Sequence, residues 1–209
     1  MPTGLIDITP PLRPGAAVFP GDAPYRVEQT FAIGPGCPVN VTSVSLSTHC
    51  GAHADAPLHY DADGASIDAL PLEDFIGPAR VIDARGEGPL CLPGEIEGYL
   101  EGTPPRVLLR LAEALDPQVW PEGFRALSPE TVELLASRGV RLVGVDVPSV
   151  DPETSKDLPA HMAFRRHDMR ILENLALRHV ETGDYELIAP PLKLEGLDAA
   201  PVRALLRRL

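Results

Sequence analysis

One short segment, STHCGAHADAPLHY at residues 47–60, concentrates side chains that bind metal ions or move protons. It holds three of the six histidines of the chain and one aspartate, in the spacing H-x3-H-x-D-x3-H. These four residues are His49, His53, Asp55 and His59. Imidazole and carboxylate groups are common ligands of divalent cations such as zinc. The segment therefore predicts a metal site; the alternative is a surface loop with scattered histidines.

The backbone conformation decides which of these side chains share a face. A regular helix would align His49 with His53 but turn Asp55 about 200° away from them. An extended strand would put all three on one face, because residues two apart point the same way. We therefore expect a strand end that leads into an irregular turn at Gly51, with Pro57 preventing a helical continuation.

A complete metal site needs ligands from elsewhere in the chain. His161 lies in an expected loop, and Glu173 lies in a segment expected to form a helix from Asp168 to about His179. In such a helix Glu173 would be on or beside a buried face, where a carboxylate needs a partner or a metal ion. The alternative is an exposed ion pair between Glu173 and Arg170.

Three nearby side chains carry weaker signals. Cys50 follows His49, but the alternation of a strand points it away from the ligands, so we interpret it as a packing residue. Asp146 and Asp151 flank a strand end. Each could hydrogen-bond to a metal ligand and orient it, or could simply be a turn residue. The chain has no GxSxG nucleophile motif and no glycine-rich phosphate loop.

The elements that must position these residues are mainly short strands. Apolar or alternating runs predict strands at residues 5–9, 26–31, 41–48, 80–84, 106–111 and 140–147. Ser128-Pro129-Glu130 begins a helix that ends at Gly139, and a shorter helix is expected near residues 95–100. The end of the chain, residues 201–209, fits either a helix or an edge strand.

This order of elements predicts the fold class. Strand, helix and strand between residues 106 and 147 indicate a βαβ unit, and long turn-rich connections indicate mixed sheets. We expect an α/β fold with a strand-rich first half, and a single domain over residues 1–209.

Composition limits the classes of function. The 209-residue chain carries a net charge of −12, so it repels phosphate backbones and anionic lipids, and we expect neither nucleic acid nor a membrane as partner. No stretch provides about 20 predominantly apolar residues, and the N-terminus lacks the features of a signal peptide. Three scattered cysteines fit a reducing compartment. We therefore expect a cytoplasmic protein that acts on a small molecule.

Taken together, these segments resemble the cyclase-like family of metal-dependent hydrolases, and AHADAPLHY is similar to its bacterial kynurenine formamidase (arylformamidase) branch. Four further stretches agree, in order, along almost the whole chain: VFPGDAPY, VPSVDPETSKDLPAH, FRRHDMRILENL and LKLEGLDAAPVRALL. The resemblance implies a swivelling β/β/α-type fold, a homodimer, and a binuclear site with two divalent ions, most often zinc.

The resemblance also implies roles for individual residues. The metal ligands would be His49, His53, Asp55, His161 and Glu173, with the two carboxylates bridging the ions. His59 would be the catalytic proton donor and acceptor. Phe19 would contact the substrate, at a position where the family often has tryptophan.

The implied reaction is hydrolysis of N-formyl-L-kynurenine to L-kynurenine and formate, in tryptophan degradation. A bound divalent cation lowers the pKa of water from about 15.7 to about 7, which supplies hydroxide to attack the formyl carbon. His59 would pass a proton to the departing aniline nitrogen. Two alternatives remain: an isatin-like cyclic-amide hydrolase or cyclase of the same superfamily, and a metal-binding protein without turnover.

Overall fold

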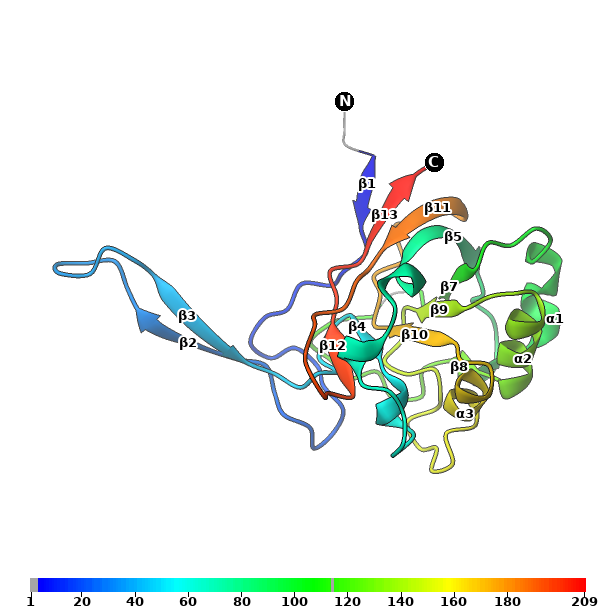
Figure 1. Cartoon of the computed structure of the whole chain (residues 1–209), viewed down its shortest axis with the longest axis horizontal. Coiled ribbons are helices and arrows are strands. Elements are labelled where there is room, and N and C mark those ends of the chain that lie inside the picture. The colour runs from blue at the N-terminus through cyan, green and yellow to red at the C-terminus, as the bar shows by residue number, and fades with distance from the viewer. Residues whose placement is uncertain (1–3, 114) are drawn as a thin grey trace.

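The computed structural model describes residues 4–113 and 115–209, and a mixed β-sheet forms its centre (Figure 1). Within these residues nine strands make the sheet, in the order β1-β13-β11-β5-β7-β9-β10-β4-β12. Strands β5, β7, β9 and β10 run parallel, and the pairs on either side of them are antiparallel. The strand bounds are β1 Leu5–Asp7, β4 His53–Asp55, β5 Ile76–Asp83, β7 Arg106–Arg110, β9 Leu142–Val145, β10 Arg170–Glu173, β11 Gly183–Ile188, β12 Ala199–Pro201 and β13 Leu205–Arg208.

The remaining elements are short. An antiparallel hairpin pairs β2 (Arg26–Phe31) with β3 (Val41–Ser45), and a small parallel pair joins β6 (Leu90–Cys91) to β8 (Ala126–Leu127). The α-helices are α1 Pro93–Ile96, α2 Pro129–Ser137 and α3 Pro159–Arg166. The 3-10 helices are η1 Pro57–His59, η2 Ile67–Ala69, η3 Leu72–Asp74 and η4 Glu97–Tyr99.

The three α-helices pack on one face of the sheet (Figure 1). Helix α2 connects the parallel strands β7 and β9, and α3 connects β9 and β10, as in βαβ units. The apolar layer between sheet and helices includes Leu109 and Val143 from the strands and Val132, Leu135 and Phe164 from the helices. Burial of this layer fixes the loops that follow β9 and β10.

The opposite face of the sheet packs mainly against other parts of the same sheet. Leu108, Leu142 and Leu172 from the parallel strands share one buried cluster with Leu187 of β11 and Leu206 of β13. Ala79 and Val81 of β5, the strand between β11 and β7, belong to the same cluster, so the cluster extends across one face of the curled sheet. The predicted α/β class, with mixed sheets and a strand-rich first half, is confirmed.

Several local predictions are confirmed. The βαβ unit between residues 106 and 147 is present as β7, α2 and β9. Helix α2 begins at Pro129, where the Ser128 hydroxyl accepts a hydrogen bond from the Thr131 amide at 3.2 Å. The chain turns away after this helix at Gly139, which has a φ of 81°. Residues 93–99 form α1 and η4, close to the expected short helix.

The predicted helix from Asp168 to His179 is wrong. Residues Arg170–Glu173 form strand β10 instead, and Asp168 and Asn174 on either side of it adopt positive φ angles of 49° and 57°. All four strand residues are buried because the sheet is covered on both faces. A short apolar run of this kind has no period that separates a strand from a helix.

One further segment differs from the sequence prediction, and another settles a choice that the sequence left open. His161 was expected in a loop but lies in helix α3. The end of the chain forms strand β13, which pairs with both β1 and β11 and so is not the outermost strand. Among the described residues, no helix has the length and apolar character needed to cross a lipid bilayer.

A substitution in β9 tests the packing of the central sheet. A Cβ atom at Gly144 would lie 2.5 Å from Leu108 Cδ2 and 2.7 Å from Leu175 Cδ1, so Gly144→Ala overpacks the core. We expect it to lower the free energy of unfolding by about 1–3 kcal/mol in urea denaturation. The matched control is Gly94→Ala in α1, where a new Cβ meets no atom within 4 Å. Equal stability of the two variants would contradict this packing.

Candidate metal centre

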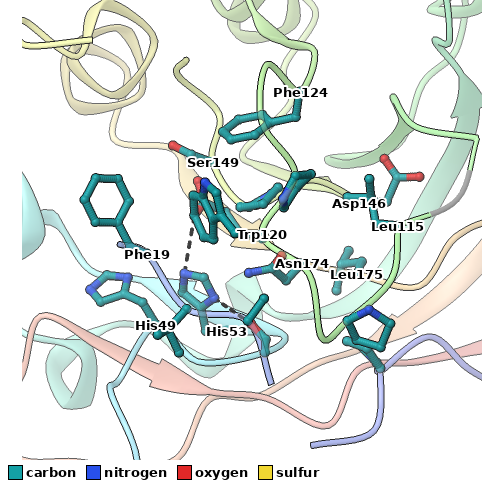
Figure 2. A pocket seen from close by; sticks show the side chains of 18 of the residues that line it. Phe19, His49, His53, Leu115, Trp120, Phe124, Asp146, Ser149, Asn174 and Leu175 are labelled. Carbon is teal, nitrogen blue, oxygen red and sulfur yellow. Dashed lines mark hydrogen bonds and ion pairs between the residues drawn. The ribbon is translucent and has the colours of Figure 1, made fainter. Parts of the chain in front are cut away.

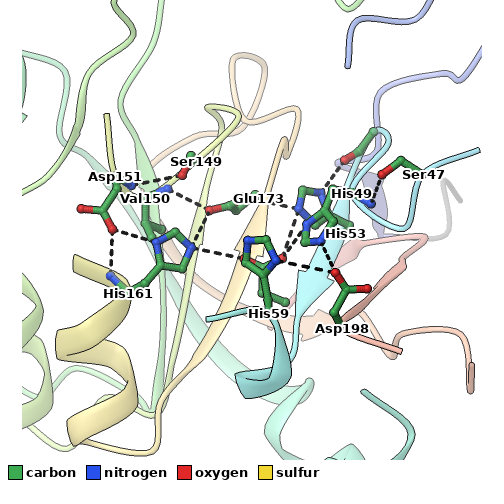
Figure 3. Close-up of polar contacts among 12 residues, drawn as sticks. Ser47, His49, His53, His59, Ser149, Val150, Asp151, His161, Glu173 and Asp198 are labelled. Carbon is green, nitrogen blue, oxygen red and sulfur yellow. Dashed lines mark hydrogen bonds and ion pairs between the residues drawn. The ribbon is translucent and has the colours of Figure 1, made fainter. Parts of the chain in front are cut away.

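The pairing of β4 with β10 brings residues from distant parts of the chain together. In this antiparallel pair His53 lies opposite Glu173, and Asp55 lies opposite Ile171. The intervening residues, Ala54 and Leu172, belong to the core on the curled side of the sheet. Because side chains alternate along a strand, His53, Asp55 and Glu173 share the helix-covered face. His53 Nε2 lies 3.3 Å from Asp55 Oδ1. It also lies 3.3 Å from Glu173 Oε2, a residue labelled beside it in Figure 3.

A turn before β4 brings His49 to the same place. Gly51 has a φ of 71°, and its carbonyl oxygen lies 2.8 Å from His53 Nδ1. This hydrogen bond directs His53 Nε2 toward the carboxylates. His49 Nδ1 lies 3.1 Å from Asp55 Oδ1. The expected irregular turn at Gly51 is therefore present, and Cys50 beside it is fully buried, as expected of a packing residue.

His161 reaches the cluster from the first turn of α3. The buried Asp151 carboxylate accepts hydrogen bonds from the Ala160 and His161 amides, both at 2.9 Å, and lies 2.7 Å from His161 Nδ1. This contact turns His161 Nε2 toward Asp55 Oδ2 at 3.5 Å and Glu173 Oε1 at 3.9 Å (Figure 3). Asp151 thus orients the imidazole of His161. Of the two alternatives for Asp151, support of a neighbouring side chain or a simple turn residue, the structure favours the first.

His59 lies in η1 at the side of the cluster. Its ring centroid is 4.2 Å from that of His49 and 5.8 Å from that of His161. Its Nδ1 is 3.7 Å from Asp198 Oδ2, and the same oxygen is 3.1 Å from His49 Nε2. Sequence reasoning missed Asp198. The only signal was its position in LKLEGLDAAPVRALL, a stretch quoted for the family resemblance.

Four buried polar atoms of the cluster indicate that the cluster suits a metal ion. These atoms are His53 Nε2, His161 Nε2 and the two carboxylate oxygens of Asp55, and none has a hydrogen-bond partner within the described part of the chain. Unpaired polar atoms are costly in a protein interior. A divalent cation accepts lone pairs from imidazole and carboxylate together, so the donor set fits such an ion.

The protonation states of the metal-free cluster follow from its charges. Burial by itself lowers the pKa of His53 and of His161, but the carboxylates outweigh it and raise both pKa values to about 10. Burial raises the pKa of Asp55, yet its contacts with His161, His49 and His53 hold that pKa well below its usual range. Without metal, protons on the imidazoles therefore balance the buried carboxylates, and a metal ion must displace them.

His59 behaves differently from the other imidazoles. Burial lowers its pKa below the usual value near 6.5, and the charges of His49 and His161 lower it further against the opposing effect of Asp55. It is therefore mainly neutral at pH 7 and able to accept a proton.

A cavity of about 520 Å³ opens beside the cluster. Its walls include His49, His53, His59, His161 and Glu173 together with many apolar residues. Phe19 packs edge-on against Trp120, with ring centroids 5.5 Å apart, and Trp120 packs against Phe124 at 6.2 Å (Figure 2). Such a volume and aromatic lining suit a small aromatic molecule.

The structure brings together all the residues that the sequence singled out. His53, Asp55 and Glu173 offer donor atoms within 4.8 Å of one another, and so do His49, Asp55 and His59. His161 Nε2 lies 3.5 Å from Asp55 Oδ2, and Phe19 lines the cavity. The surface-loop alternative fails for His53, which is 1% exposed and lies in β4, whereas His49 is half-buried and His59 is exposed. The exposed Glu173–Arg170 pair is also excluded: Glu173 is buried, and Arg170 bonds to Asp74 and Asp168.

Comparison with known proteins identifies the family of the chain. The family model Cyclase, described as "Putative cyclase", matches residues 6–152. A kynurenine formamidase from Bordetella pertussis is 55% identical over 98% of both chains. A solved structure of a predicted metal-dependent hydrolase from Bacillus stearothermophilus is 28% identical, with a TM-score of 0.81 over 97% of both chains.

A second solved structure is an isatin hydrolase A from Labrenzia aggregata. It is 25% identical, with a TM-score of 0.83 over 98% of this chain and 93% of that one. The fold, the buried cluster and the similarity along nearly the whole sequence agree with one another. The chain therefore belongs to the Cyclase family, as a relative of kynurenine formamidase.

Proposed function

We propose that this protein is a kynurenine formamidase, a hydrolase that converts N-formyl-L-kynurenine to L-kynurenine and formate. The observation that carries the proposal is a buried set of imidazoles and carboxylates that opens into an aromatic cavity. The 55% identity to a formamidase over almost the whole chain supports this substrate over a cyclic amide, since the isatin hydrolase is 25% identical. A closed metal-storage site would need no adjoining cavity.

The cofactor we propose is a pair of divalent ions, with zinc as the first choice. Five side chains would hold them: His49, His53, Asp55, His161 and Glu173. One open zinc site takes about three protein ligands, so five donors with two carboxylates exceed what one ion needs. When bound, the ions lower the pKa of water and polarise the formyl oxygen. The unpaired atoms of His53, Asp55 and His161 support this assignment.

Our proposal for His59 is proton transfer at the scissile amide. A neutral imidazole takes a proton from the attacking water and returns it to the aniline nitrogen, which is a poor leaving group while unprotonated. Asp198 Oδ2, which lies 3.7 Å from His59 Nδ1 and is hydrogen-bonded to His49, supplies a negative charge that stabilises His59 while it holds the proton. Burial keeps the imidazole neutral before the reaction begins.

The aromatic wall positions the substrate in this proposal. Phe19 and Trp120 offer an edge and a face against which the aryl ring of the substrate stacks. The Trp120 Nε1 donates to Glu153 Oε2 at 2.7 Å, which fixes the indole. Phe19 is 52% exposed in the single chain, so ligand binding has apolar surface to cover there.

A homodimer in the cytoplasm completes the proposal, and the β2–β3 hairpin supports the dimer. The hairpin extends far from the rest of the molecule, and every residue of both strands is exposed (Figure 1). Val27, Phe31, Ile33 and Val44 expose 45–66% of their surface. A lone two-stranded hairpin is only marginally stable in water, and grouped apolar side chains mark interfaces. A second copy of the chain would cover this surface.

The dimer predicts the effect of charges on the hairpin. Val27 and Val44 face each other across the two strands, so Val27→Lys with Val44→Glu keeps a favourable cross-strand pair but removes the apolar surface. We expect light scattering after size-exclusion chromatography to give a dimer for the wild type and a monomer for this variant. Leu92 is exposed but lies outside the hairpin, so the control variant Leu92→Lys should leave the dimer intact. A wild-type monomer would refute the dimer.

The proposed reaction is tested with purified protein and N-formyl-L-kynurenine. We expect formate and L-kynurenine in equal amounts, loss of turnover after chelation, and recovery when zinc is returned. Because His53 and His161 hold protons in the metal-free cluster, zinc should bind more tightly as pH rises and should release protons into a weak buffer. Full turnover in metal-free protein would refute the metal-dependent reaction.

Two substitutions separate proton transfer from metal binding. His59→Ala should keep its metal content and lose about 10²- to 10⁴-fold in kcat, because only the acid–base group is removed. Asp55→Ala should lose metal and activity together, since it removes a buried carboxylate that contacts three imidazoles. Elemental analysis beside initial rates checks both. Loss of metal in His59→Ala would make His59 a ligand instead.

A further inference from the structure

The cavity beside the metal centre contains one buried acid that the proposed chemistry does not use. Asp146 directly follows β9 and is 8% exposed, and it lines the same cavity as His53 and Glu173. In the view of Figure 2 it lies with Leu115 on the opposite side of the cavity from Phe19 and His49. Its position raises the question of what its carboxylate binds.

Within the described part of the chain, only one oxygen of this carboxylate accepts hydrogen bonds. Asp146 Oδ1 accepts the Leu111 amide at 2.7 Å and the Ala112 amide at 3.2 Å, which holds the loop after β7. The other oxygen, Oδ2, has no hydrogen-bond partner among residues 4–113 and 115–209. The charge of nearby Arg110 acts on Asp146, but the two terminal nitrogens of Arg110 donate to Val180 O and Asp83 Oδ2. Its Nε makes no hydrogen bond to Asp146 or to any other described residue. Asp146 Oδ2 is therefore an acceptor that no described residue pairs with, on a mostly buried side chain in the wall of the cavity.

The charge of this acceptor favours a cationic ligand group. Burial raises the pKa of Asp146 to about 6 despite its two amide hydrogen bonds, so the carboxylate is mostly ionised at pH 7. A buried anion with a free oxygen is unfavourable until a cation pairs with it. A ligand ammonium group supplies both the opposite charge and hydrogen-bond donors, and such charge-assisted bonds are the stronger kind.

One cavity gives a single substrate access to both Asp146 and the metal centre, because Asp146, His53 and Glu173 all line it. Glu173 is the last residue of β10, and Asp146 directly follows β9. These two strands are parallel neighbours, so both residues lie at the same edge of the sheet. Ligands of α/β sheets commonly bind at this carboxyl edge. In N-formyl-L-kynurenine the single cationic group, an α-ammonium, lies at the end of a short side chain ortho to the formamide.

We propose that Asp146 binds the α-ammonium group of the substrate and thereby selects aryl formamides that carry an amino-acid side chain. This inference rests on the proposed formamidase function and names a specificity determinant within that site. Selection follows because an analogue without the ammonium leaves the Asp146 carboxylate buried and unpaired, which lowers binding in the ground state and in the transition state alike.

Two substrates and two variants test the proposal. The substrates are N-formyl-L-kynurenine and 4-(2-formamidophenyl)-4-oxobutanoate, which lacks only the ammonium. We expect the wild type to prefer the first in kcat/KM by about 10- to 100-fold, the usual loss for one charged hydrogen bond. Asp146→Asn keeps an Oδ1 acceptor for both amides but removes the charge, so this preference should fall to near one.

A control variant at Asp116 shows whether the loss of preference is specific to Asp146. Asp116→Asn makes the same change at an exposed position on the cavity rim and should retain the wild-type preference. Equal rates of the wild type on both substrates, or an equal loss on both in Asp146→Asn, would overturn the role of Asp146. A preference lost in Asp116→Asn instead would move the ammonium site to the rim. If the wild type hydrolyses neither of the two substrates, the formamidase function itself is refuted.

Discussion

Two carboxylates buried side by side, Asp55 and Glu173, constrain the whole site. Both are at most 3% exposed, and burying such charges without compensation costs several kcal/mol. In the metal-free chain the compensation comes from protonated imidazoles, since His53 and His161 contact both acids. The same geometry gives divalent ions a complete set of donors once the protons leave. The supporting contacts of Gly51 and Asp151 serve this arrangement by directing the imidazoles inward.

The sheet explains why an apolar cavity meets this charged cluster. The parallel strands end on one edge, so the loops after β7 and β9 and the residues after β10 surround one space. Charged donors come from β4, β10 and the first turn of α3, whereas Trp120 and Phe124 come from the long connection after β7. One wall can therefore activate water while another holds an aryl ring. The two tasks rest on different segments of one scaffold.

Residue types predicted this site better than local structure did. The spacing of His49, His53 and Asp55 has chemical meaning in any extended conformation, and the structure places them together. Burial of Glu173 was inferred from a helix that does not exist. The segment is a strand, but its apolar residues are buried in a strand as they would be in a helix. Asp198 could not be found, because it meets His49 and His59 only through the pairing of β12 with β4. No local pattern encodes such a pairing.

Register is the information that the sequence lacks and the site requires. His53 faces Glu173 because β10 pairs with β4 in one particular alignment, and a slip of one residue would turn Glu173 to the opposite face. Ile171 and Leu172 oppose that slip, since each fills the core on its own side of the sheet. The packing of Ile171 and Leu172 therefore fixes the position of the Glu173 carboxylate, although neither apolar side chain is part of the metal centre. The stability of the core and the geometry of the metal centre are thus set by the same alternation in β10.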